Sequence, residues 1–185
     1  MLRVRGLLSL LLLFGFIALV VVPNYSLVFS QSPTPEEKKA EVSSFEMFWP
    51  IAAGKTRGNA IYPLKLLKEQ LRELVIFSNY KKTDYNIVLV EKRIVEAEKL
   101  INDADYANAK ETLSDARQKR DKVISLLKKV EESGQSNSNL KDRFISSLEK
   151  QAALLKFING KVPENQKSLL NSDLEHIASL LEKLR

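Results

Sequence analysis

Apolar residues recur at alternating spacings of three and four along most of the chain, which is the period of a helix that buries one side. The first such stripe consists of Leu64, Leu67, Leu71 and Leu74. Pro63 stands just before it, and proline is favoured at the first helical position because its fixed φ suits a helix. We therefore expect a first helix over residues 63–79, with the leucines on one face.

The same spacing predicts further helices over residues 84–101, 106–133, 140–158 and 164–184. Thr83 or Asp84 is suited to cap the second helix, and Asp105 the third, by accepting hydrogen bonds from the first backbone N–H groups. Gly134 follows the third helix and is a residue that commonly ends one. Ser172-Asp173-Leu174-Glu175 has the pattern of a capping box, so the last helix either restarts there or runs unbroken.

No stretch alternates apolar and polar residues with a period of two, and the turns between the expected helices are short. Short connections make consecutive helices antiparallel neighbours. The sequence therefore predicts an all-α fold, an antiparallel bundle of helical hairpins within residues 45–185. The helices over residues 84–101 and 106–133 should form its longest hairpin.

Residues 45–62 carry aromatic and aliphatic side chains without a helical period, and one proline and two glycines interrupt them. We interpret this segment as an irregular strap that crosses the helices. Its residues Phe48, Trp49 and Tyr62 either hold the strap to the helices or form an interaction patch. Gly54-Lys55-Thr56 is not a phosphate-binding loop, because that motif requires a glycine five positions before Gly54, where Trp49 stands.

The first 30 residues have the pattern of a signal peptide or membrane anchor. Arg3 and Arg5 precede the uncharged run Gly6–Val22, and no acidic residue occurs before Glu36. Positive charge ahead of an apolar run predicts that the N-terminus stays inside and that the rest of the chain is exported. The run is either cleaved near Ser30, which leaves a secreted or periplasmic protein, or retained as an outward-facing anchor through residues 6–22. A linker over residues 31–44 follows, rich in proline and charge.

Composition narrows the classes of function. The chain has no cysteine and one histidine, His176, so it offers neither a thiolate site nor a histidine pair for zinc. Its net charge of +6 is spread along the helices, which favours a solvated surface over a nucleic-acid interface. Asp103-Ala104-Asp105 lacks the remaining ligands and the glycine of a calcium loop. We therefore expect a protein that is not an enzyme and that binds no metal, cofactor, small-molecule substrate or nucleic acid.

Arg120 occupies a position on the apolar stripe of the helix over residues 106–133. Burying a lone guanidinium costs several kcal/mol, so a carboxylate of the preceding helix is a candidate partner. Glu96 is the residue we assign to this pair, with Glu91 and Glu98 as alternatives. The competing interpretation, which we favour, is an arginine whose charged end reaches solvent at the edge of the bundle.

Ile61-Tyr62-Pro63-Leu64-Lys65, followed by Lys68-Glu69 and then by Lys92-Arg93-Ile94-Val95-Glu96-Ala97, resembles a bacterial family of domains of unknown function. The resemblance spans roughly residues 48–127. It implies a helical domain outside the membrane, often behind one membrane span, and some members occur in proteins resembling anti-sigma regulators. It implies no active site. Only five residues precede the apolar run here, so direct binding of a sigma factor is not expected.

Taken together, these features predict an exported interaction or scaffold domain of the cell envelope. Its expected partners are proteins or anionic envelope polymers, besides the membrane itself if residues 6–22 are retained. The alternative is an extracytoplasmic sensor or regulatory module of a membrane signalling system.

Overall fold

Every regular element within residues 43–185, the part of the chain that this computed structural model describes, is a helix. The all-α class is therefore confirmed for this part. The expected signal peptide or anchor, and the linker up to residue 42, lie outside the described residues. The elements are α2 (Ser44–Met47), α3 (Tyr62–Leu74), α4 (Asn79–Asn102), α5 (Tyr106–Glu132), α6 (Ser138–Asn159), the 3-10 turn η1 (Glu164–Gln166) and α7 (Lys167–Leu184).

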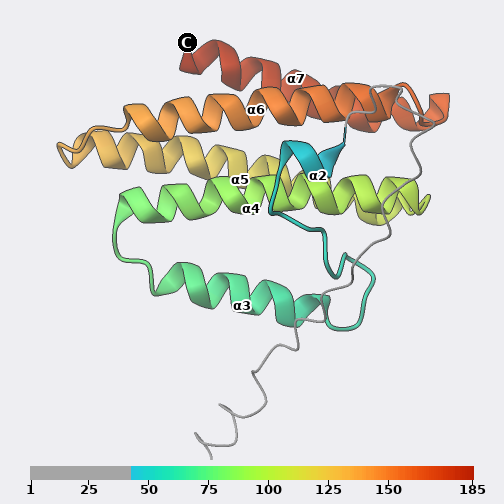
Figure 1. The fold of residues 1–185 in the computed structure, drawn as a ribbon, viewed down its shortest axis with the longest axis horizontal. Helices are drawn as coiled ribbons and strands as arrows, with labels where there is room; N and C mark the ends of the chain where they lie inside the picture. Colours follow the sequence, from blue (N-terminus) through green and yellow to red (C-terminus); the bar gives the residue numbers. More distant parts are fainter. Residues whose placement is uncertain (1–42) are drawn as a thin grey trace, which may run out of the picture. The chain divides into compact units, whose positions relative to one another are not determined.

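Two helical hairpins form the bundle. The α4–α5 hairpin is the longest, as the short turn between these helices predicts, and α6 and α7 form the second. Figure 1 shows the four helices running side by side. Their apolar stripes meet in a core in which Ile87, Ile94, Phe144 and Leu148 are fully buried. Removing each such side chain from water stabilises the fold by about 1.5–3 kcal/mol.

The helix α4 begins at Asn79, earlier than the expected start at residue 84. Ser78 is the cap in place of Thr83 or Asp84, and its hydroxyl accepts from the Lys81 N–H at 3.4 Å. Thr83 is instead buried inside the helix, where its hydroxyl donates to the Asn79 carbonyl at 2.8 Å. The start was misplaced because residues 79–84 are polar enough for a turn, and the apolar period does not reveal the cap.

The turn between α4 and α5 follows the expected capping. Asp105 caps α5, since its Oδ1 accepts from the Asn108 N–H at 3.2 Å. Ala104 stands just before it with a φ of 58°, and the Asp105 N–H donates to the Leu100 carbonyl at 2.8 Å. At the other end of α5, Gly134 adopts a φ of 75° and ends the helix, as its position predicts.

The helix α3 lies at the edge of the bundle, beside α4 and away from α6 and α7 (Figure 1). It ends at Leu74, several residues before the expected end at residue 79. A helix of a bundle ordinarily turns its apolar stripe inward. The stripe of α3 faces solvent instead, and the reason lies in how the opposite side of this helix is held.

Candidate functional site

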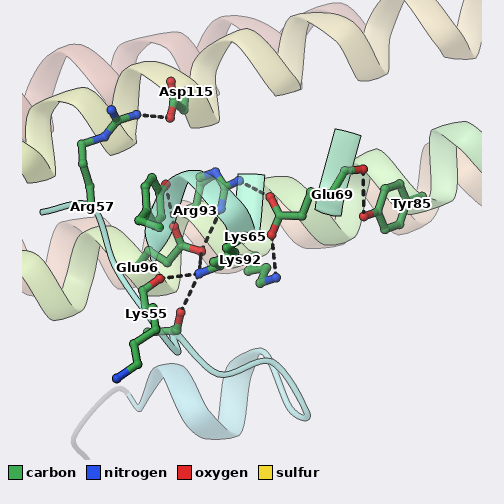
Figure 2. A network of polar contacts seen from close by, with 11 residues as sticks. Lys55, Arg57, Lys65, Glu69, Tyr85, Lys92, Arg93, Glu96 and Asp115 are labelled. Carbon is green, nitrogen blue, oxygen red and sulfur yellow. Dashed lines mark hydrogen bonds and ion pairs between the residues drawn. The ribbon is translucent and has the colours of Figure 1, made fainter. Parts of the chain in front are cut away.

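The helix α3 is attached to the bundle by its polar side. Tyr62, Lys65, Glu69 and Glu73 recur at spacings of three and four, so they share one helical face. Figure 2 shows the polar contacts that Lys65 and Glu69 of this face make with α4. A helix that docks through polar groups places its apolar residues elsewhere, so this attachment decides what α3 presents to solvent.

Glu96 of α4 is the centre of the first half of the attachment. Its side chain is fully buried and accepts hydrogen bonds from the Tyr62 hydroxyl (3.1 Å), Lys65 Nζ (2.5 Å) and Arg93 Nη1 (2.7 Å). Three donors, two of them cationic, offset the desolvation that a buried carboxylate suffers. Burial raises the pKa of Tyr62 above its usual range, with Arg93 opposing and Glu96 reinforcing that shift, so its hydroxyl stays protonated and donates.

Glu69 of α3 faces two cations of α4. Its carboxylate accepts from Lys92 Nζ at 2.6 Å and pairs with Arg93, whose guanidinium therefore bridges Glu69 and Glu96 (Figure 2). Burial alone would raise the pKa of Glu69, but Arg93 and Lys92 outweigh burial and hold this pKa below its usual range. Burial likewise disfavours the charge of Arg93, and the two glutamates more than compensate by raising its pKa.

The last turn of α3 contacts both α4 and α5. The Glu73 carboxylate accepts from Asn86 Nδ2 at 2.9 Å and pairs with Lys122 of α5. Burial acts to raise the pKa of Glu73, but the hydrogen bonds from Lys122 and Asn86 lower it overall. The Arg72 guanidinium lies 4.9 Å from the centroid of the Tyr85 ring, which is the geometry of a cation–π contact. The attachment thus extends from the first turn of α3 to the last.

The strap that precedes α3 is tied to the same network. Lys65 Nζ donates to the carbonyls of Ala53 (3.0 Å) and Lys55 (2.7 Å) in addition to the buried carboxylate of α4. Arg57 pairs with Asp115 of α5 (Figure 2). Burial lowers the pKa of Lys65, and its carboxylate partner opposes that shift. These contacts fix the position at which the chain enters α3.

The opposite side of α3 is an exposed apolar surface, which we call the α3 apolar face. Its side chains are between 49% and 92% exposed, and Phe77, just beyond the end of the helix, is the most exposed. Two exposed cations, Lys68 and Arg72, border it. Within the described residues, all exposed large hydrophobic side chains except Trp49 belong to this face. The α3 apolar face consists of Ile61, Leu64, Leu67, Leu71, Leu74, Val75 and Phe77.

The hydrophobic free energy available from covering the α3 apolar face is comparable with the cost of association. The exposed fractions of the seven side chains together equal between about four and five fully exposed side chains. At about 1.5–3 kcal/mol for each side chain removed from water, covering the face contributes about 7–13 kcal/mol before the costs of association. Those costs are about 4–15 kcal/mol. The two ranges overlap, so covering this face alone gives at most weak, reversible binding. Monomeric proteins seldom leave such a patch uncovered without a functional reason.

The structure separates the three aromatic residues that were considered as one patch. Phe48 and Tyr62 are each 3% exposed, whereas Trp49 is 67% exposed. Phe48 packs in the core, and Tyr62 belongs to the network beneath α3. Phe48 and Tyr62 therefore hold the strap to the helices, which is the first of the two interpretations of this segment. A continuous patch of all three residues does not form, because burial of two large rings stabilises the fold more than their exposure.

Arg120 neither pairs with Glu96 nor reaches solvent at the bundle edge. It is fully buried, and its Nη1 and Nη2 atoms donate to Oδ1 and Oδ2 of Asp173 on α7 at 3.0 and 2.8 Å. Its Nε atom donates to Gln151 on α6 at 2.8 Å. Glu96 is instead occupied by Arg93 and its neighbours in the attachment of α3. Asp173 was overlooked because its place after Ser172 suggested a capping box, whereas α7 runs unbroken through it.

Other candidate chemistry in the described residues is limited. No group of three or more His, Cys, Asp or Glu residues there is arranged to hold a metal ion. His176 Nε2 lies 3.0 Å from Asp121 Oδ1. A cleft of about 470 Å³ opens beside α2, and burial raises the pKa of Glu98 in its wall, with Ser44 and Lys161 opposing that shift. Within residues 43–185, no helix combines the length and the apolar character needed to cross a membrane.

Fold and surface together define, within the described residues, an all-helical domain with an outward-facing amphipathic helix. Residues 54–165 match the sequence model of a family described as "Domain of unknown function (DUF5667)". This match covers more than half of the chain, so the protein belongs to that family. A search of the curated proteins and a search of the solved structures found no match.

The family match confirms the resemblance to a family of unknown function and includes the attachment of α3. Residues 54–165 contain both Glu69 and its partners on α4, whereas α7, which supplies Asp173, lies beyond them. The spacing of the leucines did not predict which way α3 faces. The available signal was the pair of acidic residues, Glu69 and Glu73, on the side of the helix opposite the leucines.

Proposed function

We propose that this protein is a non-enzymatic interaction domain of the cell envelope and that the α3 apolar face is its binding surface. One observation carries the proposal: buried ion pairs fasten the polar side of α3, so that its leucines face water, and the apolar residues at its two ends are exposed as well. Exposing them contributes nothing to folding, whereas a partner that covers them gains hydrophobic free energy. Buried ion pairs are weak evidence for stability, and here they specify which side of the helix faces outward.

The envelope location is supported by the sequence. Arg3 and Arg5 ahead of the uncharged run Gly6–Val22 favour export of everything that follows. The domain faces outward whether the run is retained or cleaved near Ser30. An alkaline phosphatase reporter fused after Arg185 tests this orientation, because that enzyme is active only outside the cytoplasm. Activity of a cytosolic reporter alone would contradict the envelope location.

The binding surface is tested in intact cells with a photo-cross-linking amino acid at position 67, which lies in the α3 apolar face. Position 179 on α7, also exposed, is the control. We expect adducts from position 67 and none from position 179. The double variant Leu64→Gln with Leu71→Gln should abolish the adducts, while Leu64→Met with Leu71→Met should retain them because the surface stays apolar. No adduct from position 67 would contradict the proposal.

A stability measurement separates binding from folding. Leu64 and Leu71 are 66% and 54% exposed, and substitutions at such surface positions usually change the free energy of unfolding by no more than about 0.5 kcal/mol. A buried leucine that is truncated costs about 2–5 kcal/mol instead. A loss of that larger size in the glutamine variant would mean that the face is packed within the protein, and it would refute the docking role.

A further inference from the structure

We propose that the partner of the α3 apolar face is the surface of an anionic lipid bilayer. This inference rests on the proposed function, since it names what covers the face. The helix lies in the plane of the membrane interface, with its leucines among the acyl chains and its cations at the headgroups.

The charge on the outward surface of α3 fits this partner. Lys68 is exposed at the border of the face, and Arg72 is exposed beside it with its guanidinium 4.9 Å from the centroid of the Tyr85 ring of α4. The two acidic residues of the helix, Glu69 and Glu73, lie on the docked side, where cations of α4 and α5 pair with them. The outward surface of α3 therefore presents no exposed carboxylate. Leucines on one side and Lys or Arg beside them are typical of amphipathic helices that bind membrane interfaces.

The geometry of α3 suits shallow insertion. Its 13 residues make a helix about 20 Å long, and Ile61 just before it and Phe77 just beyond it are exposed as well. Interfacial helices bury their apolar side about 5–10 Å into the boundary between headgroups and acyl chains. Because α3 stands at the edge of the bundle (Figure 1), it reaches that depth while its polar side stays attached to α4.

The length of chain ahead of the domain adds a second argument. Residues 23–42 separate the apolar run Gly6–Val22 from the described part. A segment of that length spans at most about 70 Å even when fully extended. A chain anchored through Gly6–Val22 therefore keeps the α3 apolar face close to lipid at a high effective concentration, so a weak interfacial contact is sufficient.

A second copy of the chain is a poorer match for the same surface. In a two-fold dimer a surface meets its own copy, so the exposed cations Lys68 and Arg72 of both copies are gathered at one interface that has no exposed carboxylate of α3. Like charges oppose that contact. Anionic headgroups attract both side chains instead, with a gain of about fivefold in binding for each cation near the surface.

The test uses the full-length chain, inserted through its own apolar run into vesicles. One set contains phosphatidylglycerol with phosphatidylcholine, and the other contains phosphatidylcholine alone. The sequence has no cysteine, so Leu67→Cys and the control Ser179→Cys each provide one site for an environment-sensitive fluorophore. Brominated lipids quench a fluorophore that enters the acyl region. We expect quenching at position 67 and none at position 179, and we expect it to be stronger in the phosphatidylglycerol vesicles.

A matched pair of charge variants tests the electrostatic part. Lys68→Gln should lower the ratio of lipid-seated to free label about fivefold on phosphatidylglycerol vesicles. Lys128→Gln removes the same charge from an exposed position on α5 and should change nothing. Arg72 is left unchanged because its guanidinium also contacts the Tyr85 ring of α4. Circular dichroism of each variant verifies that its helices are intact. Equal effects of the two variants would overturn the assignment of Lys68 to the membrane contact.

The remaining outcomes distinguish this inference from the proposed function. Absence of quenching at position 67 on both kinds of vesicle overturns the membrane proposal, and so does energy transfer between labelled copies that identifies a dimer. In intact cells, an adduct from position 67 with lipid supports both proposals. An adduct with another protein overturns only the lipid assignment. An adduct with residues 6–22 of the same chain, or no adduct, overturns both.

Discussion

Asp173→Asn removes one negative charge from the centre of the bundle while keeping the size of the side chain. Asp173 and Arg120 are both fully buried, and two parallel hydrogen bonds of 3.0 and 2.8 Å join them. The variant leaves the Arg120 guanidinium without its counter-charge, and removing one partner of a buried pair costs about 3–5 kcal/mol. Native domains are stable by only about 5–15 kcal/mol, so the expected loss is a large fraction of the total.

Urea unfolding followed by far-ultraviolet circular dichroism measures this loss. With a slope of about 2 kcal/mol per molar urea, in the range of small domains, a loss of about 4 kcal/mol lowers the midpoint by about 2 M. The double variant Arg120→Met with Asp173→Leu removes both charges together. It should lose much less, because apolar replacement of a whole buried pair is often neutral or stabilising.

A neighbouring arginine provides the control. Arg117 approaches Asp173 at 3.5 Å, but the side chain of Arg117 is 38% exposed. Solvent screens the exposed part of Arg117, and Asp173 keeps its two hydrogen bonds from Arg120 when Arg117 is replaced, so Arg117→Gln should move the midpoint much less than Asp173→Asn. Equal shifts for Arg117→Gln and Asp173→Asn would refute the reasoning, because the buried pair would then behave as a surface contact.

Acid should loosen α3 before the rest of the bundle unfolds. The pKa values of Glu69 and Glu73 are lowered in the fold, so the stability that these ionised carboxylates contribute is complete above the usual carboxylate range and is lost as the pH falls through their folded pKa values. Amide hydrogen exchange in α3 should therefore accelerate below about pH 4, and unchanged protection there would contradict this. Ala104→Gly should increase the free energy of unfolding by up to about 1 kcal/mol and so raise the melting temperature, because Ala104 has a φ of 58°, which glycine adopts without strain. Gly58→Ala should lower stability by about 1–2 kcal/mol in urea unfolding, since its φ is 89° and a Cβ would lie 3.1 Å from Asn108; a neutral result would show that the strap adapts.

The helices of the bundle were predictable because each must bury one side, and burial imposes a period on the sequence. The expected helix over residues 106–133 differs from α5 by one residue at its end, where Gly134 marks the stop. Local hydrogen bonding was harder to foresee. Ser78 caps α4, but the apolar residues before it continue the pattern of α3 and the residues after it are polar. The apolar period alone therefore places Ser78 in the preceding helix.

The direction in which α3 faces was not predictable from its leucines. Their spacing is the same as that of the stripes that build the core, since spacing shows which residues share a face and not what covers that face. The deciding contacts lie on another helix, where Arg93 and Glu96 occupy buried positions of α4. A charged pair at such positions requires further partners, and α3 supplies them.

The partner of Arg120 was missed for a related reason. Its position on an apolar stripe correctly indicates a buried charge, but the short connection to the preceding helix favours the glutamates of that helix as partners. The actual partner, Asp173, is distant in sequence and meets Arg120 only because α7 packs against α5. Periodicity within one helix carries no information about such a contact between helices.

The polar attachment of α3 divides its residues into one set that holds the helix in the fold and another that faces solvent. Tyr62, Lys65, Glu69 and Glu73 serve the folded architecture, and substitutions there disturb how the helix is seated. The outward leucines have no such duty, so mutation can retune what this surface recognises without compromising the scaffold beneath. Binding and folding therefore depend on opposite sides of a single helix, and selection can act on each side separately.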